Sequence, residues 1–127
     1  MPLVTISLAG RHDAAVKRRM LDAAHAALVS AGVPAADRFQ RVIELDRDNL
    51  VVDARYPDLG VDRSADFVLV EVVWSVGRSV KVKRPFVAAM ASGIAAALGI
   101  DAEQVMVLIV ETAWENWAFG GGRLLHA

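Results

Sequence analysis

The sequence of 127 residues contains no cysteine, which excludes disulfide bonds, thiolate metal sites and cysteine nucleophiles. Its three histidines (His12, His25 and His126) lack the spacing of metal ligands, so we expect no metal centre. It has no apolar run of about 18 residues and no basic segment ahead of an apolar one. We therefore expect a cytoplasmic protein with no cofactor, no membrane span and no signal peptide.

Charge of one sign is also lacking, because 14 basic residues balance 15 acidic ones for a net charge of −1. Such a weak overall field gives no preference for nucleic acid or for an anionic membrane surface. Apolar residues, by contrast, are abundant: they make up 55% of the chain, and the mean hydropathy is +0.38. One small core cannot hide this much apolar surface, so we expect an oligomer.

The chain repeats itself at an offset of 67 residues without a gap. Gly10-Arg11 returns as Gly77-Arg78, and the further matched pairs include Lys17 with Arg84, Gly32 with Gly99, and Glu44 with Glu111. Apolar periodicity and turn residues predict strand, helix and strand in each unit. The predicted ranges are 3–8, 13–31 and 38–46 in the first unit, and 67–75, about 80–98 and 105–112 in the second.

Strand–helix–strand units require parallel strand pairs, and the two strands of the second unit are nearly continuous apolar runs. We therefore predict an α/β (α+β) fold whose tandem β-α-β repeats form a four-stranded, mainly parallel sheet with two helices on one face. The other face would be apolar and covered by another subunit. We expect a single domain over 1–127, with repeat unit 2–46, linker 47–65 carrying a short strand at Leu50–Asp53, repeat unit 66–119 and tail 120–127.

Pro2 has unusual chemistry, because removal of Met1 would leave its ring nitrogen as a free secondary amine. Such an amine is a base, a nucleophile and, when protonated, a proton donor, whereas other backbone nitrogens are amides. Proline at the second position permits removal of the methionine, so we expect a free Pro2. With Met1 retained the nitrogen stays an amide, and the chain would be a non-catalytic scaffold.

Six short segments, together with the two repeats and Pro2, resemble the tautomerase superfamily and especially its malonate semialdehyde decarboxylase-like branch. They are Gly10-Arg11, Asp22-Ala23-Ala24-His25, Val33-Pro34-x-x-Asp37-Arg38-Phe39-Gln40, Asp62-Arg63-Ser64, Gly77-Arg78-Ser79 and Glu115-Asn116-Trp117-x-Phe119-Gly120-x-Gly122. The resemblance spans nearly the whole chain. It implies a homotrimer with sheets facing a central core, and a cofactor-free enzyme acting on a small carboxylate substrate.

The resemblance also implies a site in which Pro2 is catalytic, Arg78 binds the substrate carboxylate and Asp37 assists. A nearby cation and an apolar pocket disfavour a charged amine, so the pKa of Pro2 would fall. A neutral amine can move a proton beside a carbonyl, which isomerises a 2-oxo acid between keto and enol forms. A protonated Pro2 would instead act as an acid in decarboxylation or hydration. Further substrate contacts and apolar walls are assigned to Leu8, Trp114, Trp117 and Phe119.

Structural roles remain open for several of these residues. Asp37 follows Pro34-Ala35-Ala36, where an aspartate commonly stabilises a turn. Arg11, the repeat copy of Arg78, either is structural or reaches the site of a neighbouring subunit. We interpret His25, on an alanine-rich helix, as a packed residue and not as a proton carrier.

One departure from the family pattern concerns the arginine pair Arg-x-Arg of the decarboxylase branch. The first position of this pair is Val76 here, so only Arg78 remains. Arg38, Arg41 or Arg123 would have to supply the second cation. The loss weakens a carboxylate clamp by about 1.5–3 kcal/mol for each charge-assisted hydrogen bond. The sequence therefore favours tautomerase activity over decarboxylase activity.

Overall fold

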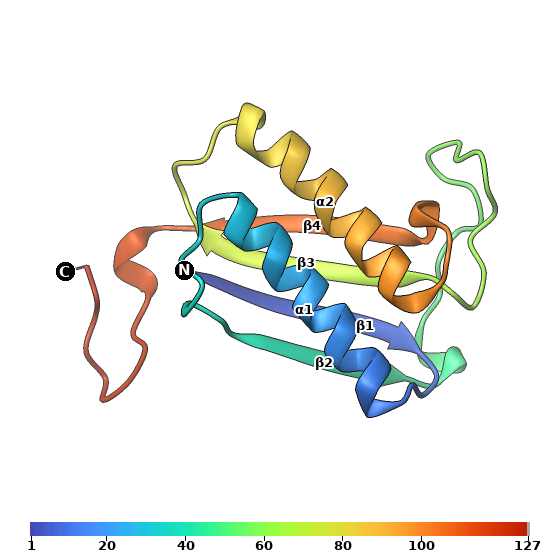
Figure 1. Cartoon of the computed structure of the whole chain (residues 1–127), viewed down its shortest axis with the longest axis horizontal. Helices are drawn as coiled ribbons and strands as arrows, with labels where there is room; N and C mark the ends of the chain where they lie inside the picture. The colour runs from blue at the N-terminus through green and yellow to red at the C-terminus, as the bar shows by residue number, and fades with distance from the viewer. Residues whose placement is uncertain (127) are drawn as a thin grey trace.

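In the computed structural model, which describes residues 1–126, two β-α-β units share one four-stranded sheet (Figure 1). The first unit comprises β1 (Pro2–Ala9), α1 (Ala14–Ser30) and β2 (Gln40–Leu45). The second comprises β3 (Val68–Ser75), α2 (Val80–Leu98) and β4 (Val105–Thr112). Every element of the predicted repeats is present with its ends within two residues, which confirms the predicted fold class. Ala127, the end of the predicted tail, lies outside the described residues.

The sheet has the order β2-β1-β3-β4. Each repeat contributes a parallel pair, β1 with β2 and β3 with β4, whereas β1 and β3 run antiparallel where the repeats meet. This arrangement brings the start of β1 to the ends of β3 and β4. In the resulting register Pro2 lies opposite Trp74, which lies opposite Glu111.

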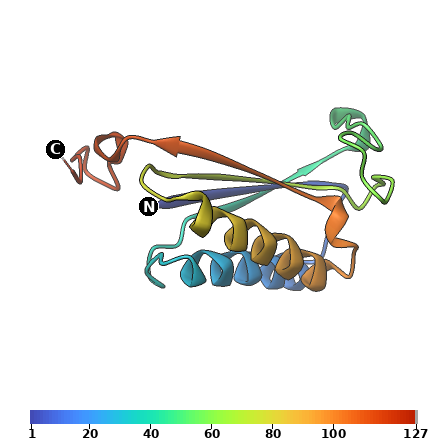
Figure 2. The same cartoon turned by 90° about the horizontal axis from the view of Figure 1, so that it is seen from above.

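Both helices cover the same face of the sheet, and the other face is bare (Figure 2). Each helix buries residues spaced three or four apart, which form one apolar stripe; they include Met20, Ala24 and Leu28 in α1 and Phe86, Met90 and Ile94 in α2. A Cβ on Gly93 of α2 would lie only 3.3 Å from the Cβ of Ala23 in α1. Glycine at this position therefore permits the close approach of the two helices.

The bare face of the sheet is apolar along β4, as predicted. Met106, Leu108 and Val110 point away from the helices and are 46%, 45% and 41% exposed. On β1 and β2 the same face also carries polar groups, since the Nε of Arg41 donates a hydrogen bond to Thr5 Oγ1 at 2.7 Å. In the single chain, therefore, these strands are covered on one face only.

The linker between the repeats differs from its prediction. Arg47–Asn49 form a 3-10 helix, and the predicted strand at Leu50–Asp53 is wrong because these residues are irregular. Val51 is 93% exposed, and the Asp53 carboxylate accepts hydrogen bonds from the N–H groups of Arg55 and Tyr56, which forms a turn. The linker lies at the end of the sheet opposite to the N-terminus (Figure 1). Within residues 1–126, neither helix is long and apolar enough to cross a membrane.

Candidate active site

The terminal amine of the chain lies against a carboxylate. The ammonium nitrogen of Met1 is 3.0 Å from Asp37 Oδ2, and the Met1 and Asp37 side chains are only 7% and 18% exposed. Pro2 itself is buried at the start of β1. Three covalent bonds separate the Met1 and Pro2 nitrogens, so these two atoms are within about 3.7 Å of each other. The structure therefore brings together Asp37 and the Pro2 nitrogen, two groups on different elements.

Unpaired polar atoms gather at this end of the sheet. Asp37 Oδ1, Trp74 Nε1 and Ser75 Oγ are buried and have no hydrogen-bond partner within residues 1–126. A buried polar atom without a partner costs about 1–3 kcal/mol, so native structures rarely keep one without a reason. Trp74 is the register partner of Pro2, so its backbone lies beside the start of β1. Three polar atoms near the terminal amine and the end of β3 are therefore left without a partner in the described part of the single chain.

Arg78 is fixed at the same end of the sheet, just after β3. Gly77 adopts a left-handed φ of 121°, and the chain turns there so that the Arg78 guanidinium carbon lies 4.3 Å from the centroid of the Trp74 ring. Its Nη1 donates a hydrogen bond to the Ser75 carbonyl oxygen at 3.1 Å. Burial lowers the pKa of Arg78, and the charges of Glu111 and Asp37 oppose this shift. An arginine stays protonated under such a shift, so Arg78 supplies a permanent cation.

An aromatic cluster, formed by Phe39, Trp117 and Phe119, lies beside the Asp37 segment. The Phe119 ring centroid is 5.4 Å from that of Phe39 and 5.7 Å from that of Trp117. Phe39 is attached to the start of β1, because the Val4 N–H donates to its carbonyl oxygen at 3.0 Å. The chain after β4 thus returns to the N-terminal end of the sheet (Figure 1). Trp117 and Phe119 were predicted site residues, whereas Phe39 and Trp74 were not.

Of the two other predicted contacts, Leu8 lies far from this site and Trp114 lies at the end of β3. The assignment of Leu8 as a pocket wall is wrong, because Leu8 is 1% exposed within the core and pairs with Val68. Along an extended strand it is roughly 20 Å from Pro2. Trp114 donates from Nε1 to the Val76 carbonyl oxygen at 3.0 Å, and its ring packs edge-on against His126 at 5.1 Å. Trp114 therefore fastens the tail to the end of β3.

Two of the three arginines considered as substitutes for the missing cation have other partners. Arg38 Nη2 is 2.6 Å from Asp22 Oδ1 on α1, and Arg41 Nε donates a hydrogen bond to Thr5 Oγ1 on the bare face. Arg123 lies in the tail, where it lines a groove together with Phe119. Within this chain, Arg38 and Arg41 therefore do not take the position that Val76 leaves unfilled.

The turn at Gly10-Arg11, the repeat copy of the Arg78 turn, lies at the opposite end of β1. Glu44 closes this turn by accepting hydrogen bonds from Lys17 Nζ at 2.9 Å and from the His12 N–H at 2.6 Å. The hydrogen bond from Lys17 is the largest cause that lowers the pKa of Glu44, and the bond from the His12 N–H adds to it. Lys83 makes the equivalent ion pair with Glu111 at 2.9 Å, although the gap-free repeat matches Lys17 with Arg84. A lysine–glutamate pair between helix and strand is thus a structural feature of both repeats.

A surface depression of about 380 Å³ lies at the linker end of the sheet and is lined by residues that include Arg47, Arg63 and Phe67. Arg63 is held there by hydrogen bonds to the carbonyl oxygens of Asp53 and Tyr56. Because this end of the sheet is opposite to the N-terminus, the depression does not belong to the site at Pro2 (Figure 1).

Known proteins resemble the chain over almost its full length. Probable tautomerase YrdN of Bacillus subtilis (strain 168) is 31% identical over 123 residues, which cover 96% of this chain and 93% of that protein. A solved malonate semialdehyde decarboxylase is 34% identical with a TM-score of 0.86, over 95% of this chain and 92% of that one. A fused 4-OT solved as a symmetric trimer has a TM-score of 0.80 over 96% of this chain and 94% of that one; at 24% identity it supports the fold alone.

A family model described as a tautomerase enzyme matches residues 37–120, a segment that includes Asp37, Arg78 and Trp117. This match and the relatives above confirm the resemblance inferred from the sequence. The chain belongs to the tautomerase family and is an enzyme of the malonate semialdehyde decarboxylase-like branch of that superfamily.

Proposed function

We propose that the chain, once Met1 is removed, is a cofactor-independent tautomerase that uses Pro2 on a small 2-oxo acid. The contact of 3.0 Å between the terminal ammonium group and Asp37 is the observation that supports this proposal most directly. It means that the fold holds the Met1 ammonium group, one residue before the Pro2 nitrogen, against an ionisable side chain instead of leaving it in solvent. Arg78, at the same end of the sheet, supplies a cation that can bind the carboxylate of such an acid.

The reaction needs only one base and one cation. Neutral Pro2 accepts the proton of the enol O–H group and returns it to the adjacent carbon, which gives the 2-oxo acid. Arg78 binds the substrate carboxylate and stabilises negative charge that develops on the oxygen. Asp37 stabilises the prolinium ion between the two proton transfers. The proton count balances, because the proton taken from oxygen is the one delivered to carbon.

The balance of charges around Pro2 selects between two roles. A carboxylate at the position of Asp37 favours the charged amine, whereas burial and the Arg78 cation favour the neutral one. A neutral amine acts as the base of a tautomerase. A charged amine acts as an acid, which suits the decarboxylase or hydratase alternative.

Met1 has two effects on this site. Its acyl group makes the Pro2 nitrogen an amide, and its side chain, 7% exposed, fills buried space beside Pro2 and Asp37. Removal of Met1 therefore creates the amine and opens the space next to it. If the native protein retains Met1, the chain serves as the non-catalytic scaffold named above.

The test is ultraviolet-monitored ketonisation of phenylenolpyruvate by methionine-free protein whose mass has been verified. We expect a rate well above that of buffer, and the buffer rate for protein that retains Met1. Methionine-free protein that matches buffer would refute the tautomerase proposal and leave the decarboxylase and scaffold alternatives. The intact mass of protein from its native source would show which form exists there.

The decarboxylase alternative rests on the similarity to malonate semialdehyde decarboxylase. Val76 occupies the position of the missing arginine, and its side chain is 43% exposed. We expect Val76→Arg to raise the decarboxylation of malonate semialdehyde by about tenfold or more, because a second cation adds roughly 1.5–3 kcal/mol of carboxylate binding. Release of acetaldehyde measures the rate. Val76→Gln, similar in length but uncharged, is the control, and equal rates for the two variants would contradict the expectation.

We also propose that the chain forms a homotrimer through the bare face of its sheet. The apolar side chains along β4 support this, because Met106, Leu108 and Val110 together form an exposed stripe that a second copy would cover. The symmetric trimer of the fused 4-OT gives the fold a precedent for this assembly.

Leu108→Lys is expected to dissociate the trimer, because an unpaired ammonium group buried in an apolar interface costs several kcal/mol. In the single chain Leu108 is 45% exposed, so the substitution leaves the fold intact. Light scattering coupled to size-exclusion chromatography measures the mass, and circular dichroism verifies the fold. Val51→Lys is the matched control because Val51 is 93% exposed in the linker. A trimeric mass for Leu108→Lys would exclude this face as the interface.

A further inference from the structure

The segment that carries Asp37 has no regular structure of its own. Residues 34–39, which we call the Asp37 loop, lie between α1 and β2. Within the loop the Asp37 N–H donates to the Pro34 carbonyl oxygen at 3.0 Å, which forms a turn. This bond shapes the turn but does not fix it relative to the terminal amine. The contact of 3.0 Å with that amine therefore needs attachments to the rest of the fold.

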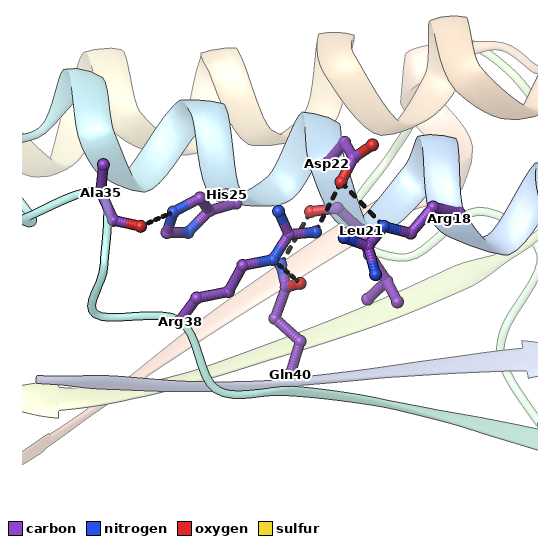
Figure 3. Close-up of polar contacts among 7 residues, drawn as sticks. All are labelled: Arg18, Leu21, Asp22, His25, Ala35, Arg38 and Gln40. Atoms are coloured by element: carbon purple, nitrogen blue, oxygen red, sulfur yellow. Dashed lines mark hydrogen bonds and ion pairs between the residues drawn. The ribbon is translucent and has the colours of Figure 1, made fainter.

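The first attachment precedes Asp37 and comes from His25 on α1. His25 Nε2 is 2.7 Å from the Ala35 carbonyl oxygen (Figure 3). A carbonyl oxygen only accepts hydrogen bonds, so Nε2 is the donor of this bond. Nδ1 is buried without a partner among residues 1–126. Burying an unpaired nitrogen costs free energy that an apolar side chain at this position would not cost. The hydrogen bond from Nε2 to the loop offsets part of that cost, which explains a histidine here.

The second attachment follows Asp37 and joins Arg38 to the same helix. Arg38 Nη2 donates to Asp22 Oδ1 at 2.6 Å, and Arg38 Nε donates to Gln40 Oε1 at 2.8 Å (Figure 3). Gln40 Nε2 in turn donates to the Leu21 carbonyl oxygen at 2.7 Å. The hydrogen bond from Arg38 is the main cause that lowers the pKa of Asp22, and the charge of Arg18 adds to it. Asp22 is therefore held as an anion that pairs with Arg38.

The two attachments use one face of α1. Asp22 and His25 are three residues apart in the helix, so their side chains are neighbours. They reach the Asp37 loop at Ala35 and Arg38, on either side of Asp37. A loop fixed at two points this close together has little freedom to move the residue between them.

We propose that His25 and the Asp22–Arg38 pair are positioning residues, which clamp the Asp37 loop to α1 and so hold the Asp37 carboxylate at the terminal amine. This inference rests on the proposed function for its catalytic consequence. Its structural part, the coupling between Asp37 and the amine, stands without it. Neither His25 nor Arg38 touches the reacting atoms.

The clamp is tested in methionine-free protein by a readout that general stability does not move, the pKa of the Pro2 amine measured by ¹⁵N NMR titration. Asp37→Asn removes the carboxylate that favours the charged amine and lowers this pKa. We expect His25→Phe, which keeps an aromatic ring but loses the donor, to lower the pKa in the same direction by a smaller amount. For ketonisation we expect a roughly tenfold loss of kcat with KM nearly unchanged, as for misplacement of a catalytic group.

Rescue by a conservative variant separates the hydrogen bond from packing. In His25→Gln the amide nitrogen takes the place of Nε2 as donor to Ala35, so this variant recovers most of the lost kcat and of the amine pKa. Arg38→Gln provides a second test at a site that is 28% exposed, where folding is not at risk if His25→Phe fails to fold. Arg19→Gln, which removes an exposed arginine elsewhere on α1, is the control that leaves both readouts unchanged.

The outcomes distinguish this inference from the proposed function. The clamp would be overturned if folded His25→Phe and Arg38→Gln both kept the Pro2 amine pKa and the kcat of the wild type. His25→Gln as impaired as His25→Phe would also overturn it. If Pro2→Ala keeps the wild-type rate while His25→Phe still lowers the amine pKa, the proposed function fails and the clamp stands.

Discussion

Replacing Pro2 by alanine in methionine-free protein is expected to lower kcat/KM for the ketonisation of phenylenolpyruvate about 10²–10⁴-fold, the usual contribution of a positioned acid–base group. Alanine also permits methionine removal, so the variant keeps a terminal amine at this position. That amine is primary and lacks the ring that fixes the nitrogen at the start of β1. The loss therefore measures the secondary amine and its fixed position, not merely the presence of a nitrogen.

A second proline-to-alanine substitution controls for effects of losing a proline that do not involve the terminal amine. Pro85→Ala makes the same exchange within α2, where Pro85 lines a surface groove beside Phe86. This variant is expected to keep the wild-type rate. A Pro2→Ala rate within about threefold of wild type, with the mass verified, would contradict proton transfer by Pro2, since acid–base catalysis contributes at least 10².

The repeat explains why the fold could be predicted so closely from the sequence. Two copies of one pattern gave each strand and helix two independent indications, and local periodicity sets the ends of such elements. The pairing of β1 with β3 has no such local signal, because it joins the two repeats. Trp74 was consequently missed: only the antiparallel register brings it opposite Pro2 and beneath Arg78.

Two predictions from local sequence pattern were wrong because the tertiary structure did not match them. One segment found no strand to pair with, and one side chain packs in the core instead of at the site. The residues from Leu50 to Asp53 are apolar enough for a strand, but no neighbouring strand pairs with them. Leu8 alternates correctly along β1, yet this alternation directs it into the core below α1 and α2. Strand propensity depends on such packing more than on intrinsic preference.

The site was predicted mainly through the family resemblance. The residues alone indicate that Pro2 has unusual chemistry and that Arg78 follows a strand. They do not indicate that Asp37 lies 3.0 Å from the terminal amine, because the two groups are separated by all of α1. Phe39 had a weak signal, its place in the Asp37-Arg38-Phe39-Gln40 segment, but its contact with Phe119 depends on the path of the tail.

Arg78→Ala is expected to lower kcat/KM about 10- to 150-fold, which corresponds to roughly 1.5–3 kcal/mol for one charge-assisted hydrogen bond to the substrate carboxylate. The guanidinium group is held by the Trp74 ring and by the Ser75 carbonyl oxygen, so its position is fixed before substrate binds. Arg78→Lys keeps the positive charge but loses the planar stacking and the forked donors. An intermediate loss is therefore expected for lysine, and steady-state kinetics of both variants measures the difference.

Arg11→Ala provides the matched comparison, because Arg11 occupies the same place in the first repeat at the opposite end of β1. If Arg11 is structural, its loss changes thermal stability and leaves kcat/KM near that of wild type. If it reaches a neighbouring subunit's site, its loss lowers kcat/KM as well, and the monomeric Leu108→Lys variant shows no further effect of Arg11→Ala. Each repeat has one arginine after its first strand, and only Arg78 lies at the end of the sheet that carries the amine. Equal kcat/KM for wild type and Arg78→Ala would therefore exclude Arg78 as the carboxylate ligand.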